Sequence, residues 1–182
     1  MHFMNRVVWV AALCGLGAVP MVQAHVVLAE PQAVAGSYYK AALRVGHGCN
    51  GSATTGITVQ VPEGFQGAKP QPKAGWRLSI RRAPLTRPYA SHGKTVTDDV
   101  VEISWQAATP DAALPDDFFD EFVWQARLPE RAGPVWIQVL QTCAQGQNNW
   151  VDVPTSGTSI QGMKTPAALL VIHPAGAAHQ NH

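Results

Sequence analysis

The chain has little charge and almost no excess of either sign. Charged residues make up 14% of its 182 residues, with 13 Lys and Arg against 12 Asp and Glu. A protein that binds nucleic acid or an anionic membrane through charge needs a basic surface. Neither nucleic acid nor a charged membrane surface is therefore an expected partner.

Long apolar runs are also lacking, apart from one near the start of the chain. This run covers residues 7–22, follows a short polar opening with the single charge of Arg6, and is broken by Pro20. It is too short for a comfortable membrane span but typical of a signal-peptide core. Val22-Gln23-Ala24 then offers the residues that a signal peptidase needs.

We therefore expect residues 1–24 to be a signal peptide and the mature protein to begin at His25 in the periplasm. An uncleaved membrane anchor is the alternative, and the bulky Leu13 argues against lipidation of Cys14. The late apolar run at 169–172 is far too short to span a bilayer. We expect no membrane anchor after processing.

Cysteine is scarce, because only Cys49 and Cys143 remain once Cys14 leaves with the signal peptide. In an oxidising compartment such a pair is most simply a disulfide. The loop that it closes is long, so chain entropy allows a stabilisation of up to about 4–5 kcal/mol. A thiolate metal site is the alternative.

No helix of ordinary length is visible in the pattern. Removal of 24 of the 182 residues leaves 158, which is enough for one domain with a sizeable core. We expect this domain to be a monomer. Short β-branched and aromatic runs recur between Gly, Pro, Asn and Asp, which is typical of strands. They predict strands at 38–45, 55–61, 76–80, 100–105, 122–128, 135–142, 150–153 and 168–172.

Without alternating helices, these strands predict an all-β fold in a single domain. We expect an antiparallel β-sandwich, immunoglobulin-like or related, over residues 25–174. The remaining residues, 175–182, predict a disordered, histidine-containing tail.

Cleavage before His25 would place a histidine at the free amino terminus. A terminal α-amine has a pKa of about 7.7–8.0, so it can lose its proton and bind a metal near neutral pH. The Nδ1 atom of the same residue can close a chelate ring. Two nitrogen donors suit Cu(II), which prefers tetragonal nitrogen and oxygen sites.

Several segments give the chain a family resemblance in addition to these arguments. It resembles the YcnI-like copper-binding domain family of bacterial exported proteins, nearly throughout residues 25–154. The matching segments are A-H-V-V-L (24–28), A-G-S-Y-Y-K (35–40), R-V-G-H-G-C (44–49), T-T-G-I-T-V-Q-V-P-E-G (54–64), K-P-Q-P-K-A-G-W (69–76), L-P-D-D-F-F-D-E-F (114–122), V-L-Q-T-C (139–143) and N-W-V-D-V-P (149–154).

The resemblance implies a β-sandwich that holds one copper ion through a single-histidine brace, with a tryptophan nearby. The brace maps onto His25, and the W-V-D-V-P segment maps the tryptophan onto Trp150. Glu30 is the candidate carboxylate ligand because it is close in sequence, although strand alternation places positions 25 and 30 on opposite faces. The other mature tryptophans are interpreted as core or loop packing: Trp76, Trp105, Trp124 and Trp136.

The remaining histidines have simpler interpretations. His47 and His92 are expected to be loop residues bonded to backbone, with a role as a second imidazole ligand as the alternative. The late histidines 173, 179 and 182 either capture metal loosely or have no function. The paired acids at 116–117 and 120–121 are interpreted as a solvated loop and a strand entry.

The function expected from these patterns is periplasmic copper binding, as a chaperone or in copper homeostasis, together with other periplasmic copper-handling proteins. We expect a binding protein and no enzyme. One rival is a copper monooxygenase, which would add a second histidine ligand and a flat aromatic substrate face. The other rival is a metal-free interaction domain.

Overall fold

The computed structural model describes residues 25–176. The expected signal peptide with Cys14, and the tail histidines 179 and 182, lie outside the described residues. The described part is almost entirely β-structure, with one short 3₁₀ turn at Pro110–Ala112. Its strands are β1 (Val27–Leu28), β2 (Gln32–Val34), β3 (Tyr38–Val45), β4 (Thr54–Gln60), β5 (Gln66–Pro70), β6 (Trp76–Ser91), β7 (Lys94–Ala107), β8 (Asp120–Arg127), β9 (Gly133–Ile137), β10 (Val139–Cys143), β11 (Gln147–Trp150) and β12 (Ala168–His173).

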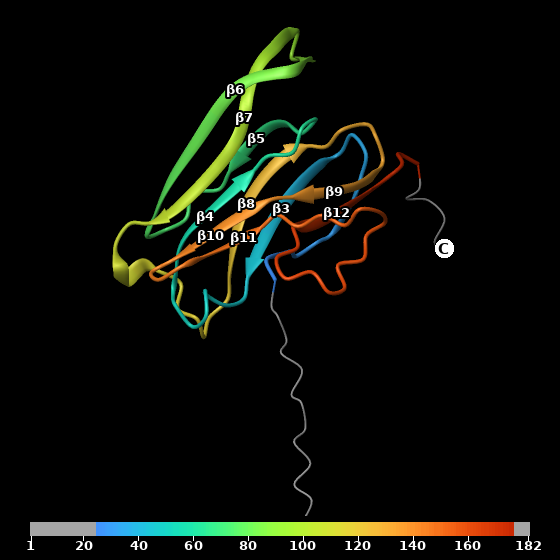
Figure 1. Cartoon of the computed structure of the whole chain (residues 1–182). Coiled ribbons are helices and arrows are strands. Elements are labelled where there is room, and N and C mark those ends of the chain that lie inside the picture. The colour runs from blue at the N-terminus through green and yellow to red at the C-terminus, as the bar shows by residue number, and fades with distance from the viewer. Residues whose placement is uncertain (1–24, 177–182) are drawn as a thin grey trace, which may run out of the picture.

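The strands form two main sheets and a smaller third one (Figure 1). One main sheet has the order β1-β3-β8-β5, and the other has the order β11-β10-β4-β7-β6. The third sheet has the order β2-β12-β9. All pairings are antiparallel except that of β2 with β12. The predicted all-β sandwich is confirmed, with this one parallel pair as an exception.

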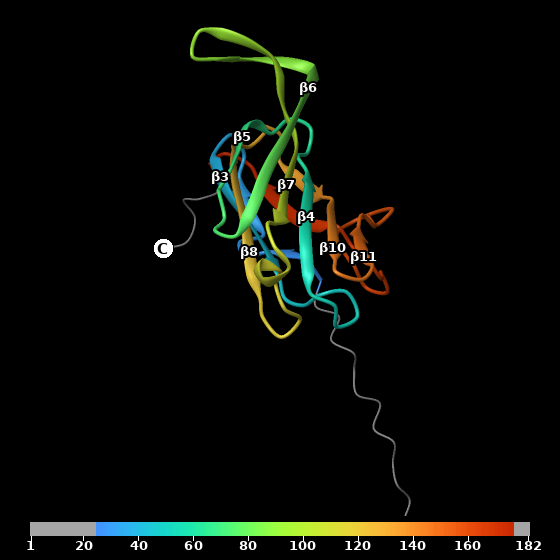
Figure 2. The same ribbon diagram turned by 90° about the vertical axis from the view of Figure 1, so that its left-hand side faces the viewer.

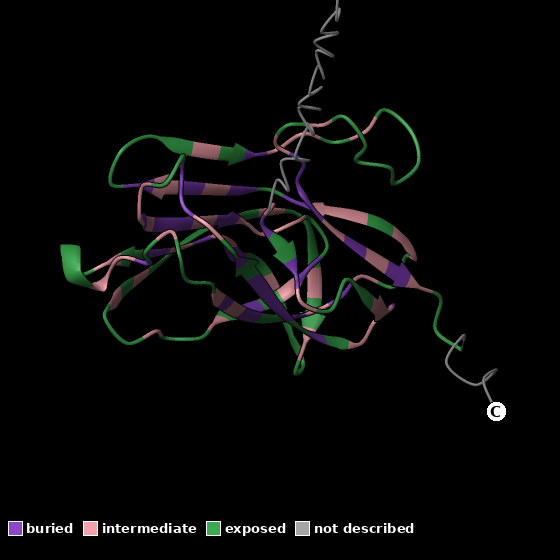
Figure 3. Ribbon diagram, turned by 90° about the horizontal axis from the view of Figure 1, so that it is seen from below, coloured by how far each residue is buried: buried purple, intermediate pink, exposed green. Residues whose placement is uncertain are grey.

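Alternation along the strands accounts for the core between the sheets. Figure 3 shows buried and more exposed positions following one another along several strands. In β4, Ile57 and Val59 are fully buried while Thr58 between them is only partly buried. Successive side chains of a strand point to opposite faces, so a strand covered on one face buries every second residue.

Aromatic side chains fill much of this core. Trp105 and Trp124 are almost completely buried, and Trp76 packs partly buried against Phe122. Trp136 is half-buried. The interpretation of these four tryptophans as packing residues is consistent with their placement.

The predicted strand at 135–142 is divided in two at Gln138. Its first half, β9, belongs to the three-stranded sheet, and its second half, β10, belongs to the five-stranded sheet. Gln138 is exposed, and its carbonyl accepts a hydrogen bond from the amide of Gln60. The chain changes sheets at this residue, which a continuous apolar pattern does not reveal.

The hairpin of β6 and β7 is longer than the sequence pattern predicts. Only 76–80 and 100–105 have the expected pattern, yet the paired strands extend to a turn at Ser91–Lys94. Figures 1 and 2 show this arm projecting beyond the sandwich. Most of its residues are exposed, so no alternation marks them as strand. At the tip, His92 and Gly93 have φ of 48° and 74°, as a two-residue type I′ turn requires.

Candidate metal centre

The disulfide expected from the cysteine pair is present. Cys49 and Cys143 are bonded, with a Cα–Cα distance of 5.9 Å across a sequence separation of 94. Cys49 lies in the loop between β3 and β4, and Cys143 ends β10. The bond therefore ties the loop that carries His47 to the five-stranded sheet.

Local structure holds this loop tightly. Cys49 and Ser52 exchange backbone hydrogen bonds of 3.0 Å around Asn50 and Gly51, whose φ values are 50° and 83°. An Asn-Gly pair with two positive φ values is the preferred two-residue turn. Just before this turn, the amide of Gly48 donates to Asp116 Oδ1 at 2.8 Å.

Gly48 lies so close to the turn that a larger residue has no room. A Cβ atom at this position would lie 1.8 Å from the backbone oxygen of Ser52. Gly48→Ala is therefore expected to lower the free energy of unfolding by about 1–3 kcal/mol, the range for overpacking. Denaturant unfolding measures this change. Gly56→Ala is the control, because its Cβ would meet nothing closer than 3.4 Å and should cost less. An equal loss of unfolding free energy in the two variants would contradict this steric explanation.

The loop also determines the protonation pattern of His47. Its Nδ1 atom lies 2.5 Å from the carbonyl oxygen of Gly48. A carbonyl only accepts, so Nδ1 carries the hydrogen and the neutral ring has its lone pair on Nε2. The expected backbone hydrogen bond of His47 is present, and the half-buried ring keeps a nitrogen suited to a metal.

His25 enters the sandwich at the start of β1. Val26 and Leu28 are buried in the core, while His25 itself is half-buried. β1 pairs with β3 through Val27 opposite Arg44 and Leu28 opposite Leu43. Burial lowers the pKa of the His25 imidazole, and the charge of His47 lowers it further. Both effects favour the neutral ring, the form that binds metal.

Trp150 lies against both imidazoles. Its ring centroid is 5.7 Å from that of His25 and 6.4 Å from that of His47, both in edge-to-face geometry. The indole is 4% exposed and belongs to the core. It ends β11, the edge strand of the five-stranded sheet, whereas His25 precedes β1, an edge strand of the other main sheet. The histidine–tryptophan cluster of His25, His47 and Trp150 thus joins the two sheets.

One buried amide connects the members of this cluster. Gln141 is fully buried, and its Nε2 donates to the carbonyl oxygen of His47 at 2.7 Å and to Thr54 Oγ1 at 2.8 Å. Its Oε1 accepts from the indole Nε1 of Trp150 at 3.1 Å and from Asn148 at 3.3 Å. Gln141 was missed by the sequence reasoning. A polar residue at a buried alternation position of the V-L-Q-T-C strand was the available signal.

Glu30 lies elsewhere on the same segment. Its side chain is exposed, and its backbone carbonyl accepts a 2.6 Å hydrogen bond from the hydroxyl of Tyr39. The chain bends at Ala29 and Glu30, directly after β1. Within residues 25–176, no three His, Cys, Asp or Glu side chains form a group that could hold a metal. The geometry gives Glu30 no support as a ligand, and that role stays a prediction.

The other singled-out residues are not part of the cluster. His92 is exposed at the tip of the hairpin arm. His173 belongs to β12, where its Nε2 lies 3.1 Å from Gln32 Oε1. Asp120 and Glu121 begin β8, as expected of a strand entry, and Asp120 forms an ion pair with Lys73 at 2.6 Å. Asp116 binds the His47 loop instead of being merely solvated.

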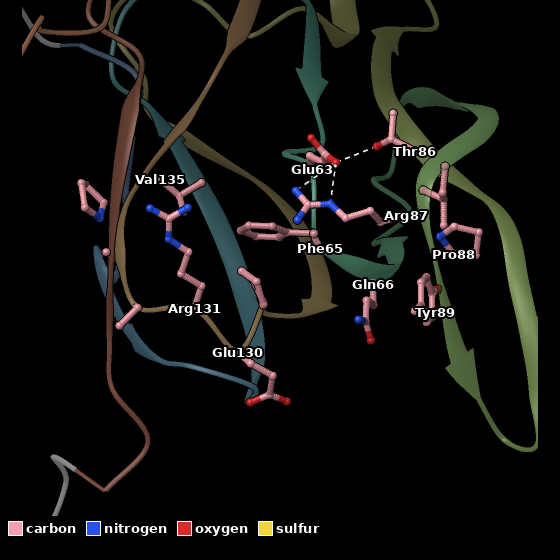
Figure 4. Close-up of a pocket in the computed structure, with 16 residues that line it drawn as sticks. Glu63, Phe65, Gln66, Thr86, Arg87, Pro88, Tyr89, Glu130, Arg131 and Val135 are labelled. Atoms are coloured by element: carbon pink, nitrogen blue, oxygen red, sulfur yellow. Dashed lines mark hydrogen bonds and ion pairs between the residues drawn. The ribbon is translucent and has the colours of Figure 1, made fainter.

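A wide groove lies at a different place. It has a volume of about 600 Å³ and lies between the outer part of β6 (residues 85–89), the segment 63–66 and the turn after β8. Figure 4 shows Glu63, Thr86 and Arg87 joined across it by hydrogen bonds. None of its lining residues belongs to the histidine–tryptophan cluster. No helix within residues 25–176 is long and apolar enough to cross a membrane.

The fold and the comparisons with known proteins together define the class of protein. The molecule is a single immunoglobulin-like β-sandwich domain with a disulfide that joins the β3–β4 loop to β10. The chain belongs to the family described as "Domain of unknown function (DUF1775)", which matches residues 25–172.

A solved structure is similar to this chain. It is the crystal structure of an uncharacterized protein from Nocardia farcinica, described as having an immunoglobulin-like fold. The two are 24% identical, with a TM-score of 0.62 over 81% of this chain and 97% of the other. At this identity the likeness shows the fold alone. No curated protein matches the chain.

Proposed function

We propose that the mature chain is a YcnI-like periplasmic protein that binds one Cu(II) ion through His25. The observation that carries the proposal is the edge-to-face contact of His25 with the buried Trp150, at 5.7 Å between ring centroids. The contact supports the pairing of these two residues that the family resemblance implies.

The donor set suits copper. After signal cleavage, His25 would offer an α-amine with a pKa near 8 and an imidazole whose pKa the fold lowers. The imidazole is then mainly neutral at neutral pH, and the amine needs to lose only a weakly held proton when a metal binds. Nitrogen donors in a chelate favour Cu(II) over the other divalent first-row metals. No free thiolate competes, because both described cysteines are in the disulfide.

Trp150 would shield the ion and leave the ligation to other residues. The only polar atom of its side chain, Nε1, donates to Gln141 Oε1, and its ring makes an edge-to-face contact with the imidazole of His25. A buried indole excludes water and fixes the orientation of the imidazole. Its role is to position and cover the metal.

The proposed role is binding, in copper delivery or homeostasis with other periplasmic copper-handling proteins. A copper monooxygenase would require peroxide-driven oxidation of a substrate as well as a copper ion. Incubation of the copper-loaded protein with peroxide and a polysaccharide separates the two functions, and we expect no oxidised product.

The test of the proposal is a Cu(II) titration of the protein that begins at His25. Binding should saturate at one ion per chain and quench part of the tryptophan fluorescence, because Cu(II) beside an indole quenches its emission. Trp150→Phe should remove most of this copper-dependent quenching and leave the domain folded by circular dichroism. Trp136→Phe is the matched control and should retain the quenching, since Trp136 is half-buried outside the cluster. Unchanged quenching in Trp150→Phe would place the metal elsewhere.

A further inference from the structure

We propose that His47 is a second imidazole ligand, so that the copper ion binds between His25 and His47 beside Trp150. This inference rests on the proposed copper binding and extends it from one histidine to two. It concerns a residue whose expected role was a backbone hydrogen bond alone.

The first argument is the register of the strands. Val27 pairs with Arg44 and Leu28 with Leu43. Continuing this antiparallel register places His25 opposite position 46, next to His47. His25 precedes β1 and His47 follows β3, so both residues lie at the same end of this strand pair, and both imidazoles contact one indole.

The second argument is the state of the His47 ring. Because Nδ1 donates to the carbonyl oxygen of Gly48, the lone pair of the neutral imidazole is on Nε2. Metal-binding histidines usually donate their other nitrogen to a carbonyl or carboxylate in this way, which orients the ring and raises its basicity. The hydrogen bond to backbone is thus compatible with metal binding and prepares the ring for it.

The third argument is the rigidity of the loop. The disulfide at Cys49, the Asn50-Gly51 turn and the bond from Gly48 to Asp116 restrict the backbone on the C-terminal side of His47. The Gln141 amide holds the His47 carbonyl and the Trp150 indole at the same time. A buried polar residue that satisfies four partners makes a precise scaffold. Gln141 would act as a positioning residue for both sides of the site.

The resulting donor set is three neutral nitrogens: the α-amine and imidazole of His25 and the imidazole of His47. Such a set fits Cu(II), which favours nitrogen ligands in a tetragonal plane. It needs no carboxylate, so Glu30 is not required as a ligand.

Pulsed electron paramagnetic resonance of the Cu(II)-loaded mature protein tests the inference, because it counts coordinated imidazoles. The wild-type protein should show two imidazoles. His47→Gln should show one and bind Cu(II) at least about tenfold more weakly in a chelator competition. His92→Gln is the matched control, an exposed histidine on the arm, and should match wild type in both measurements. Thermal unfolding and a thiol assay verify that His47→Gln keeps its fold and disulfide.

The possible failures are distinguishable. One imidazole in wild type, or an unchanged affinity and spectrum in His47→Gln, overturns the His47 ligand while leaving copper binding by His25 intact. A mature protein that does not bind one Cu(II) overturns the proposed function and this inference together. The number of coordinated imidazoles in the wild-type protein does not depend on the stability of any variant.

Discussion

One glycine added before His25 is expected to weaken Cu(II) binding by the mature protein at least about tenfold, or 1.4 kcal/mol. The added residue converts the α-amine of His25 into an amide, whose nitrogen is no longer a ready donor. The imidazole of His25 and the rest of the cluster are unchanged in this variant. Competition with a chelator of known affinity measures the loss.

His25→Ala in the mature protein should weaken binding by at least as much as the added glycine, because it removes the imidazole and leaves the α-amine as a single donor. A glycine-extended protein that binds as tightly as the mature form would exclude the chelate at the amino terminus. The copper would then be held by other histidines, and the brace at His25 would have to be abandoned. His92→Ala serves as the control and should bind as wild type.

Removal of the disulfide is expected to have the largest effect on stability. Replacing both Cys49 and Cys143 by alanine should lower the free energy of unfolding by up to about 4–5 kcal/mol, because the unfolded chain regains the entropy of a long loop. Urea unfolding measures the change. Copper affinity should fall as well, since the bond anchors the loop that carries His47.

Reduction of the wild-type protein is the matched control for the alanine variant. It opens the same loop without changing the sequence and should shift the urea midpoint in the same direction. A double variant within about 1 kcal/mol of wild type would show that the bond adds little beyond the core.

The strand pattern determined much of the fold. The strand pattern predicted β3, most of β4, β8 and β12, and the inner part of β7, because these segments have one face in the core. It missed the outer part of the hairpin arm, where both faces are exposed and no alternation exists. The pattern also missed the change of sheets at Gln138, because the sequence is apolar both before and after this residue.

For the candidate site as well, some residues were identified from the sequence and others only from the tertiary structure. The sequence predicted the disulfide, since an exported chain with two cysteines has one simple pairing, and it singled out His25 and Trp150 through chemistry and family resemblance. Only the tertiary structure decided that His47 contacts the same indole and that Gln141 joins them. These residues come from the β3–β4 loop, β10 and β11. Their proximity depends on strand register and sheet order, which local propensities do not specify.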